Sequence, residues 1–434
     1  MPEIHAFHGI RYDLGHVGSL SQVVAPPYDV ISPELQDKLY KQHPANVIRL
    51  ILNREEPGDD DPLSRYRRAA KYFREWQSQG VLFSEAQPSL YVYHQTFEYL
   101  GQTITRRGIM ARVRLEPFGE GTIYPHEQTH SAAKVDRLNL MRACQANMSQ
   151  IFGIYPDESN AAQEALEAPA RTQTPLVCHD HLGIEHRMWP VNDLEAIQQA
   201  TQHFSGKPVF IADGHHRYET ALNYRNEIAD GGELPSNHPA NFVLMMLVSM
   251  NDPGMIVLPT HRLFSGVEAR DSETLVQLLS PCFDMTVAGE GPSEAENIWE
   301  EIETGDDQGT IGLYAAADRR WVLASLNDDG RAKMKELEPE ASEEWRSLGV
   351  SILHRLIVDT LLSEEGHPKP KYVHLVPEVE EGIQCGDFPL AAIVMPASLD
   401  HIQAISKHKE RMPAKSTYFF PKLLSGLLFN PLAT

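Results

Sequence analysis

The chain lacks several features that would assign it to a class at once. Among its 434 residues there are 4 cysteines, and no two of them have the spacing of a metal site or a redox motif. No stretch approaches the roughly 18 apolar residues of a membrane helix, and the N-terminus lacks the charged head and apolar segment of a signal peptide. We therefore expect buried free thiols, no membrane association and a cytoplasmic location.

Basic residues are also in short supply. The chain has 38 Lys and Arg against 60 Asp and Glu, which gives a formal net charge of −22. A surface that binds nucleic acid normally carries a clustered basic face, and anionic membranes attract positive charge, so neither partner is expected. A local basic pocket for one nucleotide is compatible with this total.

Two familiar nucleotide motifs are missing as well. The sequence contains no GxxxxGK[ST] motif and no GxGxxG motif. Any nucleotide site is therefore neither of the Walker type nor of the dinucleotide-binding type.

The apolar pattern predicts a mixture of helices and strands. Hydrophobic residues make up 42% of the chain, enough for a sizeable core in two or three domains. The pattern predicts a hairpin of strands 89–99 and 103–115, a buried strand at 242–249 and a short strand at 46–53. It also predicts amphipathic helices at 63–79 and 348–362 and a loop at 227–238. We predict an α+β fold with a phosphate-binding domain over 1–235 and a second mixed domain over 236–434, whose C-terminal tail folds back.

The segment from Val209 to Leu222 is the most informative part of the chain. Val209-Phe-Ile-Ala reads as a buried strand, Asp213-Gly214 as a tight turn, and the residues from His215 onward as the start of a helix. The first N–H groups of a helix have no intrahelical partner, and the helix dipole favours an anion there. Because His215, His216 and Arg217 add side-chain donors, the pattern predicts a phosphate site, with a hairpin or helix cap carrying surface histidines as the alternative.

This turn resembles a known signature. Asp213-Gly214-His215-His216-Arg217 is similar to the DGHHR motif of the free serine kinases, which belong to the ParB/sulfiredoxin-like superfamily. Other segments, spread over nearly the whole chain, resemble a prokaryotic family described only as a domain of unknown function. They are Ala25-Pro-Pro-Tyr-Asp-Val-Ile-Ser32, Pro125-His-Glu-Gln-Thr129, Lys134-Val-Asp-Arg-Leu138, Ala146-Asn-Met-Ser-Gln-Ile-Phe-Gly-Ile-Tyr155, Leu258-Pro-Thr-His-Arg-Leu263 and Met412-Pro-Ala-Lys-Ser-Thr-Tyr-Phe-Phe-Pro-Lys422.

The resemblance implies a ParB/sulfiredoxin-like core and a small-molecule kinase. In the free serine kinases the turn holds nucleotide phosphates, and a glutamate of a His-Glu pair deprotonates the serine hydroxyl. Here the matching pair is His126 and Glu127. The implied donor is ATP or ADP, the implied acceptor is free L-serine, and Mg²⁺ is inferred from phosphoryl transfer in general.

The same segment supports a second interpretation. His126-Glu127-x-x-His130 matches the HExxH pattern of zinc hydrolases. That chemistry requires both histidines on one face of a helix, with the glutamate as base. Pro125 lies directly before the first histidine, and proline is tolerated only in the first turn of a helix.

Four further segments contain candidate substrate-binding residues. Lys134 and Arg137 could clamp a phosphate or a carboxylate, or simply pair along their helix. Asp29 could take a ligand amine or cap a helix, although Ser32 already supplies a cap. Polar residues after an apolar strand, and lysines in a tail rich in aromatic residues, complete the set, namely Thr260, His261, Arg262, Lys415 and Lys422.

Three hypotheses follow. The first is the serine kinase, the second is a ParB-like nucleotide-binding regulator without small-molecule chemistry, and the third is the zinc hydrolase. The second should carry a basic DNA-binding module, which the sequence does not contain. The sequence leaves the metal ligands and the oligomeric state open.

Overall fold

The computed structural model describes residues 2–127, 129, 131–363 and 370–433, which form two compact units. Unit 1 comprises Met1–Pro125, Thr129–Met255 and Pro421–Thr434, and unit 2 comprises His126–Gln128 and Ile256–Phe420. Both units contain helices and sheets, which confirms the α+β class. Within the described ranges, no helix is long and apolar enough to cross a membrane.

Unit 1 is built on a mixed nine-stranded sheet with the order β6-β11-β8-β12-β5-β4-β10-β9, in which β1 also pairs with β5. Its strands are β1 (Ile4–His5), β4 (Leu90–Tyr99), β5 (Gln102–Arg114), β6 (Ile123–Tyr124), β8 (Ile151–Tyr155), β9 (Leu176–His179), β10 (Glu185–Val191), β11 (Val209–Asp213) and β12 (Phe242–Ser249). Two small ladders pair β2 (Ile10–Tyr12) with β3 (Leu82–Ser84) and β7 (Ala146–Asn147) with β21 (Asn430–Pro431).

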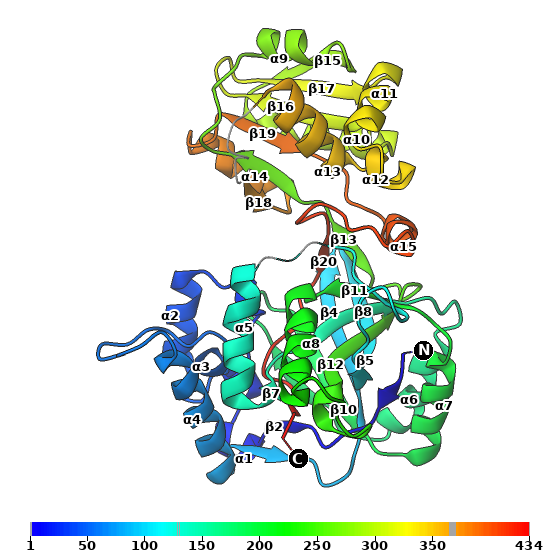
Figure 1. Cartoon of the computed structure of the whole chain (residues 1–434). Helices are drawn as coiled ribbons and strands as arrows, with labels where there is room; N and C mark the ends of the chain where they lie inside the picture. Colours follow the sequence, from blue (N-terminus) through cyan, green and yellow to red (C-terminus); the bar gives the residue numbers. More distant parts are fainter. Residues whose placement is uncertain (1, 128, 130, 364–369, 434) are drawn as a thin grey trace. The chain divides into compact units, whose positions relative to one another are not determined.

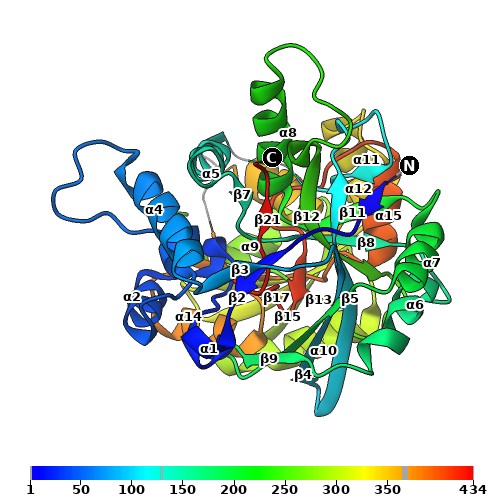
Figure 2. The same ribbon diagram turned by 90° about the horizontal axis from the view of Figure 1, so that it is seen from below.

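Helices of unit 1 pack on the sheet and on one another. They are α1 (Leu14–Val17), α2 (Pro33–Gln42), α3 (Ile48–Ile51), α4 (Ser64–Ser78), α5 (Ser131–Cys144), α6 (Ala161–Ala170), α7 (Leu194–Phe204) and α8 (His215–Ala229), with the short 3₁₀ turns η1 (Leu20–Gln22), η2 (Tyr28–Val30) and η3 (Pro239–Asn241). Helices α6 and α7 lie side by side, as do α5 and α8 (Figures 1 and 2). Apolar residues of α6, α7 and α8 share one core with alternate residues of the strands, such as Val243, Met245 and Leu247 of β12.

Strand β12 explains why the first domain is longer than predicted. Every residue of Phe242–Ser249 is buried, because the strand pairs with β5 on one side and with β8 on the other. A strand buried on both faces reads as a continuous apolar run. The predicted boundary at residue 235 would place this central strand in the wrong unit, and unit 1 extends to Met255.

The C-terminal tail belongs to unit 1 and is held by buried side chains. Gln95 Nε2 donates to the Lys422 carbonyl at 3.0 Å, and Gln150 Nε2 donates to the Leu424 carbonyl at 2.9 Å. Arg106 also donates to the Pro421 carbonyl. These bonds fix the position of Lys422 in unit 1.

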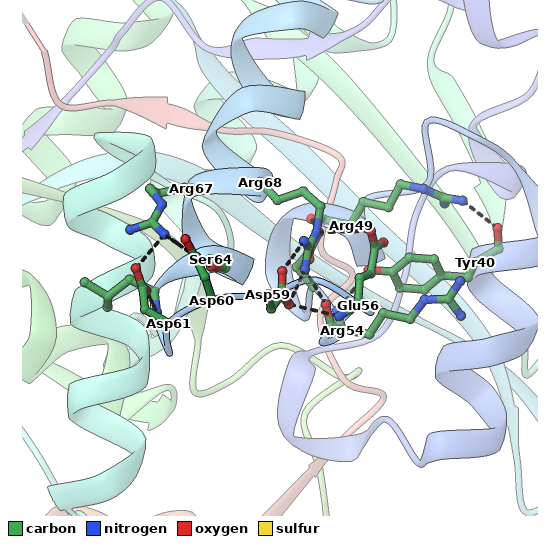
Figure 3. A network of polar contacts seen from close by, with 12 residues as sticks. Tyr40, Arg49, Arg54, Glu56, Asp59, Asp60, Asp61, Ser64, Arg67 and Arg68 are labelled. Atoms are coloured by element: carbon green, nitrogen blue, oxygen red, sulfur yellow. Dashed lines mark hydrogen bonds and ion pairs between the residues drawn. The ribbon is translucent and has the colours of Figure 1, made fainter.

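The acidic loop between α3 and α4 is tied down by arginines of α4 (Figure 3). Arg68 contacts both carboxylate oxygens of Asp59, at 2.7 and 2.9 Å, and Arg67 donates to Asp61 at 2.6 Å. Arg54 lies over the ring of Tyr40 at 4.3 Å. This cluster neutralises the loop's acidic side chains within unit 1, and it contains none of the predicted site residues.

Unit 2 contains an antiparallel six-stranded sheet with the order β15-β17-β16-β19-β14-β18. The strands are β14 (His261–Phe264), β15 (Phe283–Glu290), β16 (Thr310–Ala315), β17 (Arg320–Leu326), β18 (Lys371–Val373) and β19 (Leu390–Ile393), and a separate ladder joins β13 (Ile256–Leu258) to β20 (Tyr418–Phe420). The helices are α9 (Ser272–Leu279), α10 (Ala295–Gly305), α11 (Asp328–Leu337), α12 (Glu343–Ser347), α13 (Gly349–Ser351), α14 (Val376–Gln384) and α15 (Leu399–Lys407), with the 3₁₀ turn η4 (Pro292–Glu294) and the π-helical segment η5 (Ile352–Leu361).

Several local predictions hold and others fail. The hairpin β4–β5, the strand β12 and the helix α4 are confirmed. The predicted strand at 46–53 is wrong, because Asn46 Oδ1 accepts from the Ile48 N–H at 2.9 Å and starts the short helix α3. A short apolar run alone does not distinguish a strand from a buried helix.

Three further expectations need correction. Helix α8 continues through Ala229, so the predicted loop at 227–238 begins later. The helix predicted over 348–362 has the wider π pattern from Ile352 to Leu361. Cys144, Cys178 and Cys282 are buried free thiols, whereas Cys385 is exposed because it follows the end of α14 at a turn.

Candidate functional site

The predicted phosphate turn has the expected local geometry. Strand β11 ends at Asp213, and a β-bulge between Ile211 and Asp213 shifts its register against β8. Gly214 follows with φ +94° and is the N-cap of α8. This left-handed conformation suits glycine and lets the chain turn directly from the strand into the helix. Asp213 thus lies both at the bulge and directly before the N-terminus of α8. A bulge changes the direction in which a side chain points, and bulges are common next to functional sites.

Arg217 folds back over this turn. Its Nη1 donates to the Gln150 carbonyl, and its Nη2 lies 3.3 Å from Asp213 Oδ2. A Cβ at Gly214 would lie 2.9 Å from the Arg217 guanidinium, so the glycine is needed for this contact as well as for its φ. The arginine is therefore fixed beside the N-terminus of α8.

Lys422 provides a second cation at the same carboxylate. Its Nζ lies 3.7 Å from Asp213 Oδ1, and its side chain is 15% exposed. Behind it, Arg106 is fully buried, and burial lowers the pKa of its guanidinium to about 10 although Tyr93, Asp252 and Asp213 partly oppose that shift. Positive charge thus gathers around the turn of a chain whose net charge is −22.

A cavity of about 40 Å³ adjoins the turn, lined by residues that include Tyr28, Arg137, Arg217 and Thr220. Arg137 stacks over the Tyr28 ring at 3.9 Å. Burial raises the pKa of Tyr28, and the Arg137 charge counteracts part of that rise. Thr220 Oγ1 is buried and has no hydrogen-bond partner within the described part of the chain. A buried hydroxyl without a partner marks a place for a water molecule or a ligand atom.

Other predicted residues of unit 1 have protein partners. Lys134 Nζ donates to Glu219 of α8 at 2.8 Å, so it pairs with a neighbouring helix and not along its own. Arg137 pairs with Asp136 and donates to the Ile51 carbonyl at 2.7 Å. Ser32 Oγ caps α2, while Asp29 is exposed in η2. His215 is buried and His216 is half-buried.

The remaining predicted residues gather in unit 2. Glu127 Oε1 accepts from the Lys415 N–H at 2.6 Å, and Glu127 forms an isolated parallel bridge with Met412. His126 is buried, and its Nε2 lies 3.0 Å from Thr417 Oγ1. The pair therefore has an extended backbone next to the loop that precedes β20.

Thr260 lies directly before β14, His261 and Arg262 are the first two residues of that strand, and all three are buried. Arg262 Nη2 donates to the Lys415 carbonyl at 2.8 Å. His261 packs edge-to-face against Trp299 at 5.3 Å, and burial together with the nearby Arg262 charge lowers the pKa of its imidazole to about 3. At neutral pH this imidazole is uncharged.

The backbone conformation of residues 126 and 127 contradicts the zinc-hydrolase interpretation. Residues 126 and 127 are not helical, and α5 begins at Ser131. Proline at 125 and the bridge from Glu127 to Met412 hold this segment extended. His130 lies outside the described residues. The helical face that would align the two histidines of the motif is therefore absent at residues 126–127.

Sequence reasoning also missed some features. His354 of η5 is half-buried beside Phe264 with its Nε2 buried, and this environment together with the Arg262 charge lowers the pKa of its imidazole to about 4. A lone histidine in an amphipathic helix gave no signal. A cavity of about 880 Å³ along α2 contains none of the predicted residues. Among the residues described, no group of three His, Cys, Asp or Glu side chains is arranged to hold a metal ion.

A family model described as "Protein of unknown function (DUF1015)" matches residues 4–351. The chain belongs to the DUF1015 family. No curated protein matches its sequence. This membership confirms the family resemblance found in the segments of the sequence.

The chain is also similar to several solved structures. A free serine kinase variant in complex with AMP is 12% identical, with a TM-score of 0.35 over 69% of this chain and 84% of that chain. Another variant of a free serine kinase, in complex with ADP, is 13% identical, with a TM-score of 0.36 over 69% and 84%. SbnI with a C-terminal truncation, from Staphylococcus aureus, is 12% identical, with a TM-score of 0.34 over 73% and 85%.

Proposed function

We propose that this DUF1015 protein is a small-molecule kinase that transfers a phosphoryl group from ATP or ADP to the hydroxyl of free L-serine. The observation that carries the proposal is the turn at Asp213–Arg217. There a strand, a left-handed glycine and a helix N-terminus meet two cations, Arg217 and Lys422. This combination supports binding of a phosphate chain, because the dipole of the helix and charged donors both favour an anion.

The reaction itself needs few groups from the protein. The serine hydroxyl oxygen forms a bond to the terminal phosphorus of the donor, and the bond from that phosphorus to the bridging oxygen breaks, which leaves ADP or AMP. The hydroxyl proton passes to a base, for which we propose Glu127. Positioning and charge neutralisation provide most of the acceleration in such transfers.

Mg²⁺ fits this proposal. In kinase sites the ion is commonly bound by one or two carboxylates together with the phosphates of the nucleotide, so a dedicated cage of protein ligands is not required. Asp213, whose carboxylate lies between Arg217 and Lys422, is the residue that would hold it. When bound, the ion neutralises phosphate charge.

The first test is ³¹P NMR with purified protein, Mg²⁺, ATP or ADP, and L-serine. The proposal expects phosphoserine to accumulate with one of the two donors. Nucleotide binding without phosphoserine would reject serine as the acceptor and favour a nucleotide-binding regulator.

Arg217→Ala tests the donor site. We expect nucleotide affinity to fall about 10- to 100-fold, because a charged hydrogen bond to phosphate contributes about 1.5–3 kcal/mol. Arg225→Ala, on the same helix, is the matched control, since Arg225 Nη1 donates to the Leu115 carbonyl. Unchanged affinity in Arg217→Ala, measured by calorimetry, would remove the phosphate site from the proposal.

Glu127→Gln tests the base. The substitution keeps the size of the side chain and removes its ability to accept a proton, so kcat should fall at least about 100-fold. Nucleotide affinity should stay within twofold of the wild type. Glu344→Gln, a half-exposed carboxylate of unit 2, is the control. Near-normal turnover of Glu127→Gln would exclude Glu127 as the base.

A further inference from the structure

Lys415 has a backbone conformation that residues with side chains rarely adopt. Its φ is +60°, in the left-handed region, although Lys415 is not a glycine. Such conformations persist where the surroundings hold them, and they concentrate at functional sites. Two side chains hold the backbone groups of Lys415. Glu127 Oε1 accepts its N–H at 2.6 Å, and Arg262 Nη2 donates to its carbonyl at 2.8 Å.

Arg262, which binds the Lys415 carbonyl, has an unusual environment for an arginine. It is fully buried, its Nη1 donates to the Thr260 carbonyl, and its guanidinium lies 5.6 Å from the Tyr372 ring centroid. Within the described chain no carboxylate forms an ion pair with it and its Nε has no partner. Taking a charge out of water without an ion-pair partner is costly, so a buried arginine of this kind requires a reason other than stability.

The charge of Arg262 is nevertheless connected to Glu127. Burial lowers the pKa of Arg262 to about 10, and the charges of Tyr372 and Glu127 counteract part of that shift. The segment around Glu127 is fixed to the same loop, because the Met412 N–H donates to the His126 carbonyl at 2.7 Å. The polar chain Glu127–Lys415–Arg262 thus links three segments that are distant in sequence.

We infer that Arg262 is a positioning residue for Glu127, acting through the backbone of Lys415. The guanidinium is planar and fork-shaped, so it can bind the Thr260 and Lys415 carbonyls together. That hold keeps Lys415 in its left-handed conformation, and the Lys415 N–H then fixes one oxygen of the Glu127 carboxylate. The inference rests on the proposed function, in which Glu127 is the base.

Amide exchange tests the linkage without any reference to activity. In the full-length protein, hydrogen exchange at the Lys415 amide should be at least about tenfold faster in Arg262→Gln than in the wild type, because loss of the hold frees this N–H locally. Arg262→Lys, which keeps the charge but loses the fork, should have an intermediate rate. Arg355→Lys, a half-exposed arginine of unit 2 that pairs with Glu338, is the control and should exchange as the wild type does.

Kinetics test the consequence. With ATP or ADP and serine, Arg262→Gln should lower kcat by about 10- to 100-fold, the cost of a small misplacement of a reacting group. The KM for nucleotide should stay within twofold, and Arg262→Lys should recover part of kcat. A general loss of folding would instead lower the concentration of active protein without this division between kcat and KM.

Amide exchange and kinetics together distinguish failure of the proposed function from failure of the inference about Arg262. If the wild type makes no phosphoserine, the proposed function falls, and the exchange rate alone decides whether Arg262 holds Lys415. An unchanged Lys415 exchange rate in folded Arg262→Gln overturns the inference, as does an unchanged kcat in an active enzyme. If neither Arg262 variant folds, Glu127→Gln must accelerate proton exchange of the Arg262 guanidinium, because the linkage is reciprocal. No acceleration there overturns the inference.

Discussion

Acidification should destabilise unit 2 through His354 and His261, whose imidazoles have lowered pKa values. His354 is held neutral because burial, and then the positive charge of Arg262, lower the pKa of its imidazole from 6.5 to about 4. His261 is held neutral in the same way, with a pKa of about 3. The unfolded chain binds protons to both residues at its ordinary pKa, near 6.5. Between about pH 4 and 6.5 the unfolded state therefore binds more protons than the folded state.

The direction and size of the change in the free energy of unfolding follow from the linkage between proton binding and folding. Where the unfolded state binds more protons, the free energy of unfolding rises with pH, so unit 2 loses stability as the pH falls below 6.5. At pH 5 the medium is 1.5 units below the unfolded pKa and still above the folded pKa of about 4. Each pKa unit corresponds to about 1.4 kcal/mol, so His354 alone should lower the free energy of unfolding by about 2 kcal/mol between pH 7 and pH 5.

The assay is denaturant unfolding at both pH values, for the wild type and for His354→Gln, which cannot titrate. The difference between the two pH dependences isolates the contribution of His354. His408→Gln, an exposed histidine of the same unit, is the control and should leave the wild-type dependence in place. If His354→Gln loses as much stability as the wild type between pH 7 and pH 5, the folded protein does not hold this histidine in its neutral form and the reasoning is wrong.

Two further predictions concern the phosphate turn. Gly214→Ala should lower the free energy of unfolding by about 1–2 kcal/mol and also weaken nucleotide binding, because its φ is +94° and its Cβ would displace Arg217. Gly101→Ala is the control, because Gly101 also has a positive φ of +73° but a Cβ there would meet no other atom, so this variant should leave nucleotide binding unchanged. Equal nucleotide affinities in the two variants would contradict the role of Arg217. Lys422→Met should weaken nucleotide binding about tenfold, as measured by calorimetry. Lys71→Met, at an exposed lysine, is the control and should leave the affinity unchanged. An affinity that does not depend on Lys422 would exclude the C-terminal tail from the site.

Local features were predicted where the interactions are local. The strand, turn and helix around Asp213-Gly214 follow from apolar residues, a glycine and a helical pattern within one short segment, and the structure has them there. Strand β12 and the hairpin β4–β5 were predicted because an apolar run and a strict alternation each have one good structural solution. The family resemblance was likewise carried by short segments of sequence.

Predictions failed where a distant contact decided the outcome. The run after Asn46 is a helix because the Asn46 side chain bonds to the Ile48 N–H and to carbonyls of residues 22 and 24. Lys134 pairs with Glu219 of α8, 85 residues away, and not along its own helix. The predicted boundary near 235 lies before β12, whereas unit 1 continues to Met255, because no local signal shows which sheet a buried strand will join.

By itself the sequence determined the strand, turn and helix around Asp213–Arg217 and the chemical types proposed for a kinase, since both depend on neighbouring residues. Only the tertiary structure decided which of those residues meet. It brings Lys422 from the C-terminal tail to Asp213, and it links Glu127 to Arg262 through Lys415. It also lowers the pKa of the His354 imidazole, so that this half-buried side chain is neutral. The physical reason is that burial, charge pairing and backbone strain arise from contacts between segments far apart in the chain, and no local pattern records them.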